Sequence, residues 1–125
     1  MHESGEDYLE TIYVLKHRNG SVRSVDVAQE LNFSRPSVSR AVGILKQNGY
    51  LTVAEDGELI LTKQGITKAE SVYDRHTSLT KFLIMTAKVD AKTAEADACR
   101  IEHIISQSTF AGIKKYIKEN EKENE

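Results

Sequence analysis

The stretch that decides the fold is SVDVAQELNFSRPSVSRAVGILKQNGY, residues 24–50. It predicts a short helix over Val25–Leu31, which Ser24 caps, and a further helix that Ser34 caps after the turn Asn32-Phe33-Ser34. Pro36 is compatible with that further helix because proline is tolerated in a first helical turn. Two short helices joined by a turn of about three or four residues are typical of a helix-turn-helix.

The residues on either side extend this motif. After Asn48-Gly49, the β-forming residues Tyr50–Val53 and Leu59–Leu61 flank the turn Glu55-Asp56-Gly57-Glu58, which predicts a β-hairpin, the wing of a winged helix. Apolar residues at helical spacing predict further helices over Gly5–His17, from Gly65 to about Thr86, near Thr93–Ser106 and over Thr109–Lys118.

The expected fold is therefore mainly α-helical with a small β-hairpin. Residues 1–72 are expected to form a winged helix-turn-helix DNA-binding domain, and residues 73–125 a helical domain. The last stretch of about fifty residues is too short to bury a core alone, so its apolar faces are expected to meet a second copy of the chain. A symmetric homodimer is the expected assembly.

The composition excludes several classes of protein. With 125 residues, 39% hydrophobic and 29% charged, the chain has a globular rather than a disordered or collagen-like profile. No apolar run approaches the roughly 20 residues that cross a bilayer, and the acidic N-terminus is unlike a signal peptide. We therefore expect a cytoplasmic protein with no membrane partner. A single cysteine, Cys99, excludes an intramolecular disulfide.

The charge distribution favours contact with double-stranded DNA at one place. The formal net charge is only -2, but residues 32–50 carry Arg35, Arg40 and Lys46 and no acid. Arginine binds guanine through two hydrogen bonds, and serine binds bases or phosphates. The alternative, a capped polar helix face on any small domain, is weakened by the adjacent short helix and hairpin. The candidate DNA-binding residues are Ser34, Arg35, Pro36, Ser37, Ser39 and Arg40.

A second group of residues indicates metal chemistry. Cys99, Glu102 and His103 are spaced i, i+3 and i+4, so on one helix their thiolate, carboxylate and imidazole would share a face. All three are metal-ligand types. Taken alone, such a triplet is more often a buried cysteine beside a solvated glutamate and histidine.

Residues on two other predicted helices strengthen the metal hypothesis. His76 lies on the apolar face of the long helix, where a core histidine is the ordinary interpretation. Asp7 and Glu10, spaced i and i+3, are ordinarily solvated acids near a helix start. Together three helices offer six candidate ligands, which suits one or two transition-metal ions. They are Asp7, Glu10, His76, Cys99, Glu102 and His103.

A nucleophilic pair of Cys99 and His103 is the other chemical interpretation. Side chains at i and i+4 of one helix point in parallel rather than at each other, and the sequence shows no orienting third member and no glycine-rich oxyanion turn. We therefore expect that the protein is not an enzyme.

Four segments together resemble the diphtheria-toxin-repressor family of metal-activated transcriptional repressors. They are EDYLETIY at residues 6–13, the helix-turn-helix, YDRH at residues 73–76 and ACRIEH at residues 98–103. The resemblance covers nearly the whole chain. It implies an N-terminal winged helix, a helical metal-binding and dimerisation domain, and a short manganese-type member without the SH3-like domain of the iron-type members.

The ligand pattern is a hybrid of the two branches of that family. Asp7 and Glu10 look like the manganese-type pair, whereas Cys99 looks iron-type because the manganese type has glutamate there. His76 matches the histidine of the iron type's ancillary site, but Thr80 stands where a glutamate is expected and Glu95 where a histidine is expected. The pattern leaves open the identity of the metal, one or two ions per chain, and whether Glu95 joins the site.

The function implied is a Mn²⁺- or Fe²⁺-activated repressor of metal-uptake genes that binds a palindromic operator. An ion joining Asp7 and Glu10 to the ligands of the second domain would fix the angle between the two domains, and thereby the separation of the recognition helices in the dimer. The alternative is a winged-helix regulator that responds to a small organic ligand or a partner protein, without metal. A metal-buffering protein is a third class, against which the recognition helix speaks.

Overall fold

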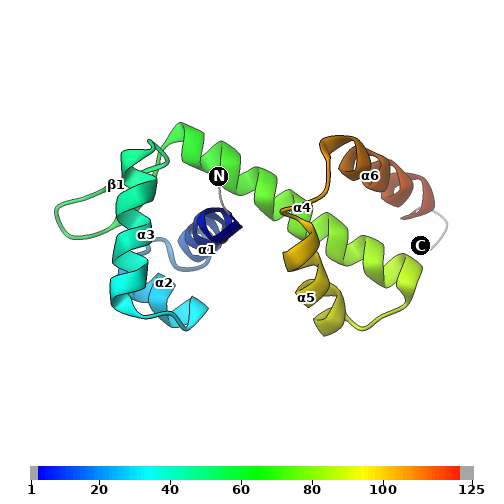
Figure 1. Ribbon diagram of the computed structural model, residues 1–125, viewed down its shortest axis with the longest axis horizontal. Helices are drawn as coiled ribbons and strands as arrows, with labels where there is room; N and C mark the ends of the chain where they lie inside the picture. The colour runs from blue at the N-terminus through cyan, green and yellow to red at the C-terminus, as the bar shows by residue number, and fades with distance from the viewer. Residues whose placement is uncertain (1–2, 122–125) are drawn as a thin grey trace. The chain divides into compact units, whose positions relative to one another are not determined.

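The computed structural model describes residues 3–121 (Figure 1), which divide into two compact units on either side of the boundary between Ser71 and Val72. The division falls within the long helix α4. In chain order the elements are α1 (Glu3–Asn19), α2 (Ser24–Leu31), α3 (Arg35–Gln47), β1 (Leu51–Val53), β2 (Leu59–Leu61), α4 (Lys63–Ala87), α5 (Ala91–Ile101) and α6 (Gln107–Glu121). No helix over these residues is long and apolar enough to cross a membrane.

The first unit packs α1, α2, α3 and the hairpin around one hydrophobic core. Each of these elements places at least one side chain in the core that is 1% exposed or less, namely Leu9 and Ile12 of α1, Val27 of α2, Val38 of α3, Leu51 of β1 and Leu59 of β2. Their helical or alternating spacing is the pattern that predicted the elements. The mainly α-helical fold with a winged helix-turn-helix is confirmed.

The helix-turn-helix begins one residue earlier than expected. Ser24 is the first residue of α2 rather than its cap, and Arg23 holds the extended N-cap conformation. The cause is Asp26, whose Oδ2 accepts the Arg23 backbone N–H at 2.8 Å. Helix α2 ends at its C-cap Asn32, the first residue of the turn, which adopts the left-handed conformation at φ 57°. Ser34 caps α3 as predicted, with its Oγ accepting the backbone N–H of Ser37 at 3.3 Å.

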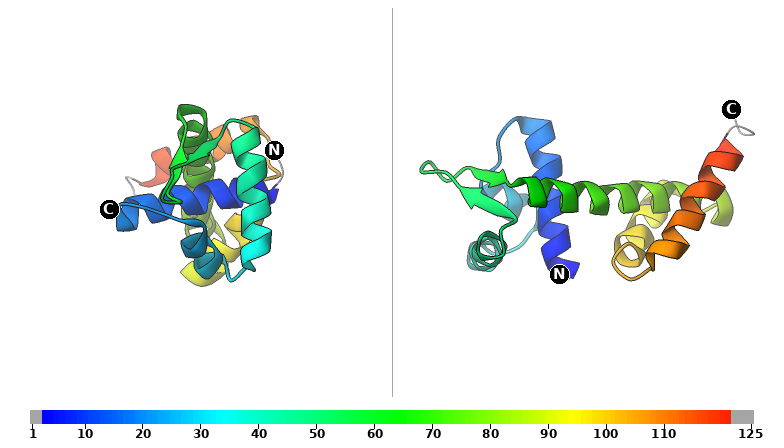
Figure 2. Two further views of the ribbon diagram at one scale, coloured as in Figure 1. Left: turned by 90° about the vertical axis from the view of Figure 1, so that its left-hand side faces the viewer. Right: turned by 90° about the horizontal axis from the view of Figure 1, so that it is seen from above.

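The hairpin pairs β1 and β2 antiparallel, with Thr52 opposite Ile60. Its loop projects away from the helices of the first unit (Figure 2). The first turn of α4 packs closely against Tyr50, at the start of the hairpin. A Cβ at Gly65 would overlap the carbonyl oxygen of Tyr50. That carbonyl also accepts the Thr62 N–H at 3.0 Å. Gly65 therefore fixes how the start of α4 meets the hairpin.

The second unit contains the later part of α4 together with α5 and α6. Its buried apolar side chains include Val72 and Leu79 of α4, Ala98 of α5 and Phe110 of α6. The prediction of one helix over Thr93–Ser106 is wrong at its end, since α5 stops at Ile101 and residues 102–105 form a turn. The carbonyls of Glu102 and Ile105 bind the Arg75 side chain instead of continuing a helical ladder.

Candidate functional site

Glu102 is the buried centre of the candidate metal site. It is the C-cap of α5 and only 2% exposed, although it is a carboxylate. Its Oε2 lies 2.9 Å from Nδ1 of His76 on α4, and its Oε1 lies 3.3 Å from Nε2 of His103. A buried carboxylate needs compensating partners, and here two imidazoles from different parts of the unit face it.

Cys99 completes a compact group within the second unit. One ligand atom from each of Cys99, Glu102 and His103 lies within 4.8 Å of the others. The ordinary alternative, a buried cysteine beside a solvated glutamate and histidine, does not describe this arrangement. Cys99 is exposed, whereas the side chains of Glu102 and His103 are 0% and 3% exposed.

The other two candidate ligands, Asp7 and Glu10, belong to the first unit. Asp7 and Glu10 are both half-buried residues of α1, one turn apart, in the first unit. Their participation in a site with the residues of the second unit stays a prediction. Glu95 is exposed on α5, and Thr80 donates its hydroxyl to the carbonyl of His76 at 2.7 Å.

The residues of the second unit fit a transition-metal ion. Glu102 Oε1 is buried and has no hydrogen-bond partner among the residues that the structure describes. A buried carboxylate oxygen without a hydrogen bond is costly unless a cation or donor reaches it. Imidazole nitrogen, thiolate sulfur and carboxylate oxygen form a donor set that Zn²⁺, Fe²⁺ and similar ions accept, while the carboxylate also suits Mn²⁺.

The predicted DNA-contacting residues lie on one accessible stretch at the start of α3. All six are exposed, while Val38 between them is fully buried and anchors the helix. Ser34 and Ser37 are joined by a hydroxyl hydrogen bond of 2.9 Å. Within residues 3–121, Arg35 and Arg40 form no ion pair, so both guanidinium groups are available to a polyanion.

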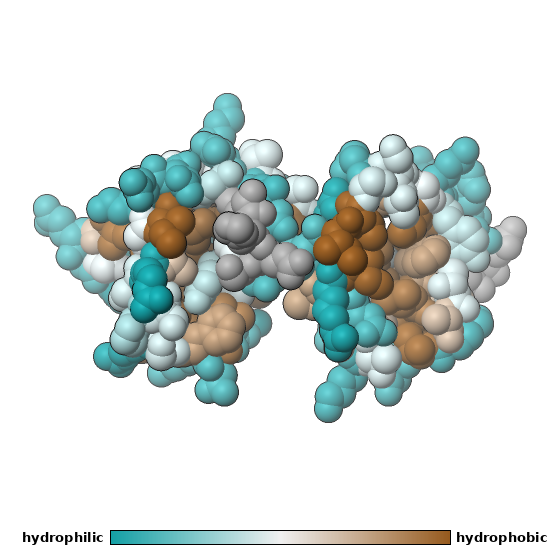
Figure 3. All heavy atoms as spheres, viewed as in Figure 1, coloured by the Kyte–Doolittle hydropathy of each residue, from teal (hydrophilic) through white to brown (hydrophobic). Residues whose placement is uncertain are grey.

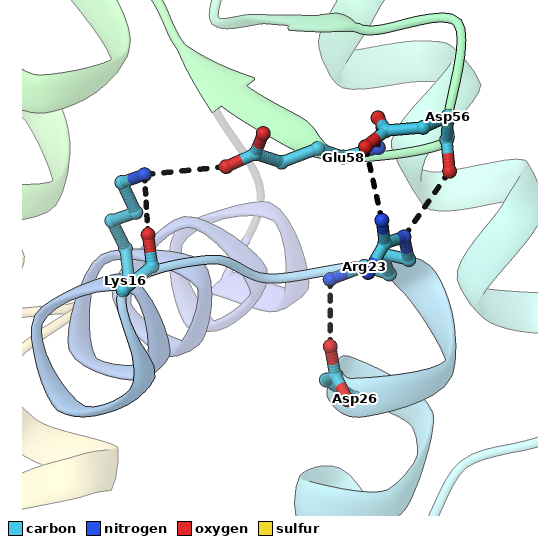
Figure 4. Close-up of polar contacts among 6 residues, drawn as sticks. Lys16, Arg23, Asp26, Asp56 and Glu58 are labelled. Carbon is cyan, nitrogen blue, oxygen red and sulfur yellow. Dashed lines mark hydrogen bonds and ion pairs between the residues drawn. The ribbon is translucent and has the colours of Figure 1, made fainter.

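Two ion pairs between basic side chains and carboxylates stabilise the wing, the hairpin of β1 and β2 (Figure 4). The Arg23 side chain donates from Nη2 to Oδ2 of Asp56 at 3.0 Å and from Nε to the backbone carbonyl of Asp56 at 3.1 Å. Lys16 at the end of α1 reaches Glu58 Oε1 at 3.2 Å and the Gly20 carbonyl. The Glu58 N–H donates to Asp56, and this bond, together with Arg23, holds the pKa of Asp56 below its ordinary value. Sequence patterns identified the hairpin but not these contacts.

Hydrophobic side chains are exposed on the second unit (Figure 3). The larger ones are Tyr73 and Ile84 of α4, Ile104 of the turn after α5, and Tyr116 of α6. Ile104 is 72% exposed. Exposed apolar groups of this size are typical of surfaces that meet another protein chain.

Two family descriptions cover the chain almost completely. Residues 1–59 match "Iron dependent repressor, N-terminal DNA binding domain". Residues 62–124 match "Iron dependent repressor, metal binding and dimerisation domain". The chain belongs to the iron-dependent repressor family. The iron-dependent repressor match over residues 62–124 includes His76, Cys99, Glu102 and His103.

Individual iron-dependent repressors and their relatives agree with this assignment. An uncharacterized HTH-type transcriptional regulator of Methanocaldococcus jannaschii is 32% identical over 91% of this chain and 92% of its own length. The regulator MntR of Listeria welshimeri is 35% identical over 86% of this chain and 75% of its own. The diphtheria toxin repressor of Corynebacterium diphtheriae is 30% identical over 94% of this chain, which spans only 52% of that repressor.

The solved structures support the same fold. That of the manganese regulator SloR superposes with a TM-score of 0.82 and 27% identity, over 91% of this chain and 53% of the other. The predictions of a metal-dependent DNA-binding repressor with a dimerisation domain are confirmed by the family. The family is described by repression, DNA binding and metal binding, and its description names no catalytic activity.

Proposed function

We propose that this iron-dependent repressor is a cytoplasmic homodimer, activated by Mn²⁺ or Fe²⁺, that binds a palindromic operator and represses metal-uptake genes. It acts through DNA binding and not through catalysis. Residues 1–72 serve as the DNA-binding domain and residues 73–125 as the metal-binding and dimerisation domain. The observation that carries the proposal is the buried carboxylate of Glu102, whose Oε2 lies 2.9 Å from Nδ1 of His76 and whose Oε1 lies 3.3 Å from Nε2 of His103 without accepting a hydrogen bond within the described residues.

The proposed ligands are Asp7, Glu10, His76, Cys99, Glu102 and His103, for one or two ions per chain. Glu102 supplies a buried, dehydrated carboxylate. His76 and His103 hold this carboxylate in one orientation. Asp7 and Glu10 extend the set from the DNA-binding domain. When bound, the metal supplies positive charge that links ligands of both domains and restricts their relative motion.

The restriction matters because a dimer must place two recognition helices about 34 Å apart to enter successive major grooves. A dimer with mobile DNA-binding domains occupies many separations, of which few fit DNA. Charge acts in the same direction, because divalent cations offset the formal net charge of -2 beside a surface that approaches phosphates.

The proposed contacts to DNA are made by Ser34, Arg35, Pro36, Ser37, Ser39 and Arg40. The exposed arginines read base edges or phosphates, and the serines bind phosphates or bases. Support comes from the accessibility of this segment and from the absence of acidic residues in residues 32–50.

Calorimetric titration with Mn²⁺ tests the ligand assignment. Glu102→Gln keeps the shape of the side chain but removes its charge, and His103→Ala removes an imidazole, so both variants should lose most of their Mn²⁺ affinity while circular dichroism shows an unchanged helix content. Glu119→Gln, an exposed acid on α6, is the control and should titrate like the parent. Unchanged Mn²⁺ binding in both Glu102→Gln and His103→Ala would refute the site.

A further inference from the structure

The turn after α5 carries Glu102 and His103, and one side chain outside the ligand set holds it in place. Arg75 of α4 donates from Nη1 to the carbonyls of Glu102 at 3.0 Å and Ile105 at 3.1 Å. Its Nη2 donates to Oε1 of Gln107 at 3.0 Å. The guanidinium therefore connects the end of α5, the turn and the start of α6 to α4.

Packing fixes the guanidinium in this position. Its central carbon lies 5.3 Å from the ring centroid of Phe110, which is 4% exposed. A guanidinium over an aromatic face is attracted by the ring, and its planar fork can serve several acceptors at once. Arg75 also meets the carbonyl of Glu102, the C-cap of α5, close to the negative end of the α5 dipole.

The Arg75 contacts affect the metal site through Glu102, which α4 binds both at its backbone and at its side chain. Arg75 binds its backbone carbonyl, and the adjacent residue His76 faces its carboxylate at 2.9 Å. Without the Arg75 contacts, the residues 102–105 would lose two hydrogen bonds that set the direction of the Glu102 and His103 side chains. Lysine can reproduce them only in part, because its ammonium lacks the planar fork.

We propose that Arg75 is a positioning residue of the metal site, which acts by fixing the turn that presents Glu102 and His103. This inference rests on the proposed function of those two residues as ligands. Outer contacts of metal ligands typically contribute about 10- to 100-fold to metal affinity. Arg75→Ala should therefore weaken Mn²⁺ binding by about that factor, and Arg75→Lys by less.

Lys114→Ala is the matched control. Lys114 also lies over Phe110, at 5.6 Å, and pairs with Asp74 of α4 at 2.7 Å, but no hydrogen bond from it to the turn is present in the part of the chain described. The Mn²⁺ affinity of Lys114→Ala should stay within about twofold of the parent's, because this substitution leaves the outer contacts of the ligands intact. An equal loss of affinity in Arg75→Ala and Lys114→Ala would show general loosening of the unit and overturn the proposal.

Two further measurements separate positioning from stability. In the metal-free protein, hydrogen exchange of the amides at 102–105 should be faster in Arg75→Ala and unchanged in Lys114→Ala. With saturating Co²⁺, the visible absorption bands, which report ligand geometry, should be altered in Arg75→Ala and partly restored in Arg75→Lys. Parent-like Mn²⁺ affinity and Co²⁺ spectrum in Arg75→Ala would overturn this inference alone. A parent protein that binds neither metal would overturn the proposed function as well.

Discussion

Cys99 is the residue that sets the chemical character of the proposed ligand set. A thiolate is softer than a carboxylate and must lose its proton to bind a metal. Cys99→Glu should therefore shift relative affinity from Co²⁺ and Zn²⁺ toward Mn²⁺, and should make metal affinity less dependent on pH near neutrality. Competitive titrations of the parent and the variant at several pH values measure both effects.

Because Cys99 is exposed, a glutamate at this position displaces no buried side chain. Cys99→Ser is the control, because it removes the thiolate without adding a carboxylate and should weaken binding of every metal. If Cys99→Glu ranks the metals as the parent does, with the same pH profile, Cys99 is not a ligand.

Arg40 is the exposed residue most suited to base recognition on α3. If it contacts a guanine edge, Arg40→Ala should weaken specific DNA binding by about 1–3 kcal/mol and relax the preference at one base pair. Affinities for a panel of single-base variants of a selected duplex would measure this. Uniform weakening over the whole panel would mean that Arg40 contacts only phosphate, which is the result expected for Lys46→Ala at the other end of α3.

At the scale of elements, the junction between the hairpin and α4 leaves no room for a side chain at Gly65. Because a Cβ at Gly65 would overlap the Tyr50 carbonyl, Gly65→Ala should lower the free energy of unfolding by about 1–3 kcal/mol. Chemical denaturation checks this. Gly43→Ala, on the exposed side of α3 with no atom near its added Cβ, should instead be neutral or stabilising. Equal stability of the two variants would contradict the close contact.

The wing should respond to pH through Asp56. Its pKa is lowered in the folded protein, so the ionised carboxylate stabilises the wing above the unfolded-state pKa, and this contribution is lost as the pH falls through the lower, folded value. Wing amides near Glu58 should therefore become mobile below about pH 4. Arg23→Ala should produce part of that mobility at neutral pH.

Nuclear magnetic resonance relaxation of the Gly57 and Glu58 amides measures this mobility. Glu55→Ala is the control, because Glu55 belongs to the same turn but forms no ion pair within the described range 3–121. Global stability should change little in either variant, since Arg23 and Asp56 are about half exposed, at 47% and 59%, and exposed ion pairs contribute little. Wing amides that stay rigid in Arg23→Ala would show that the hairpin is held without this contact.

At the scale of the whole molecule, the sequence predicts what depends on local pattern and misses what depends on distant contacts. Apolar spacing and turn residues predicted the helices and the hairpin, and the ligand types drew attention to Cys99, Glu102 and His103. The sequence did not indicate that α5 ends before Glu102, because the cause is Arg75, 27 residues away along the chain. It also missed Asp26 as the residue that moves the α2 cap to Arg23.

The central claim is that metal binding and DNA binding are coupled in this repressor. The most direct test is fluorescence anisotropy of a duplex selected from random sequences, titrated with the protein with and without Mn²⁺. The account predicts at least about tenfold tighter binding with Mn²⁺, an equal gain in Mn²⁺ affinity when the duplex is present, and loss of both effects in Glu102→Gln. Equal DNA affinity of the parent with and without Mn²⁺, Fe²⁺ or Co²⁺ would contradict it.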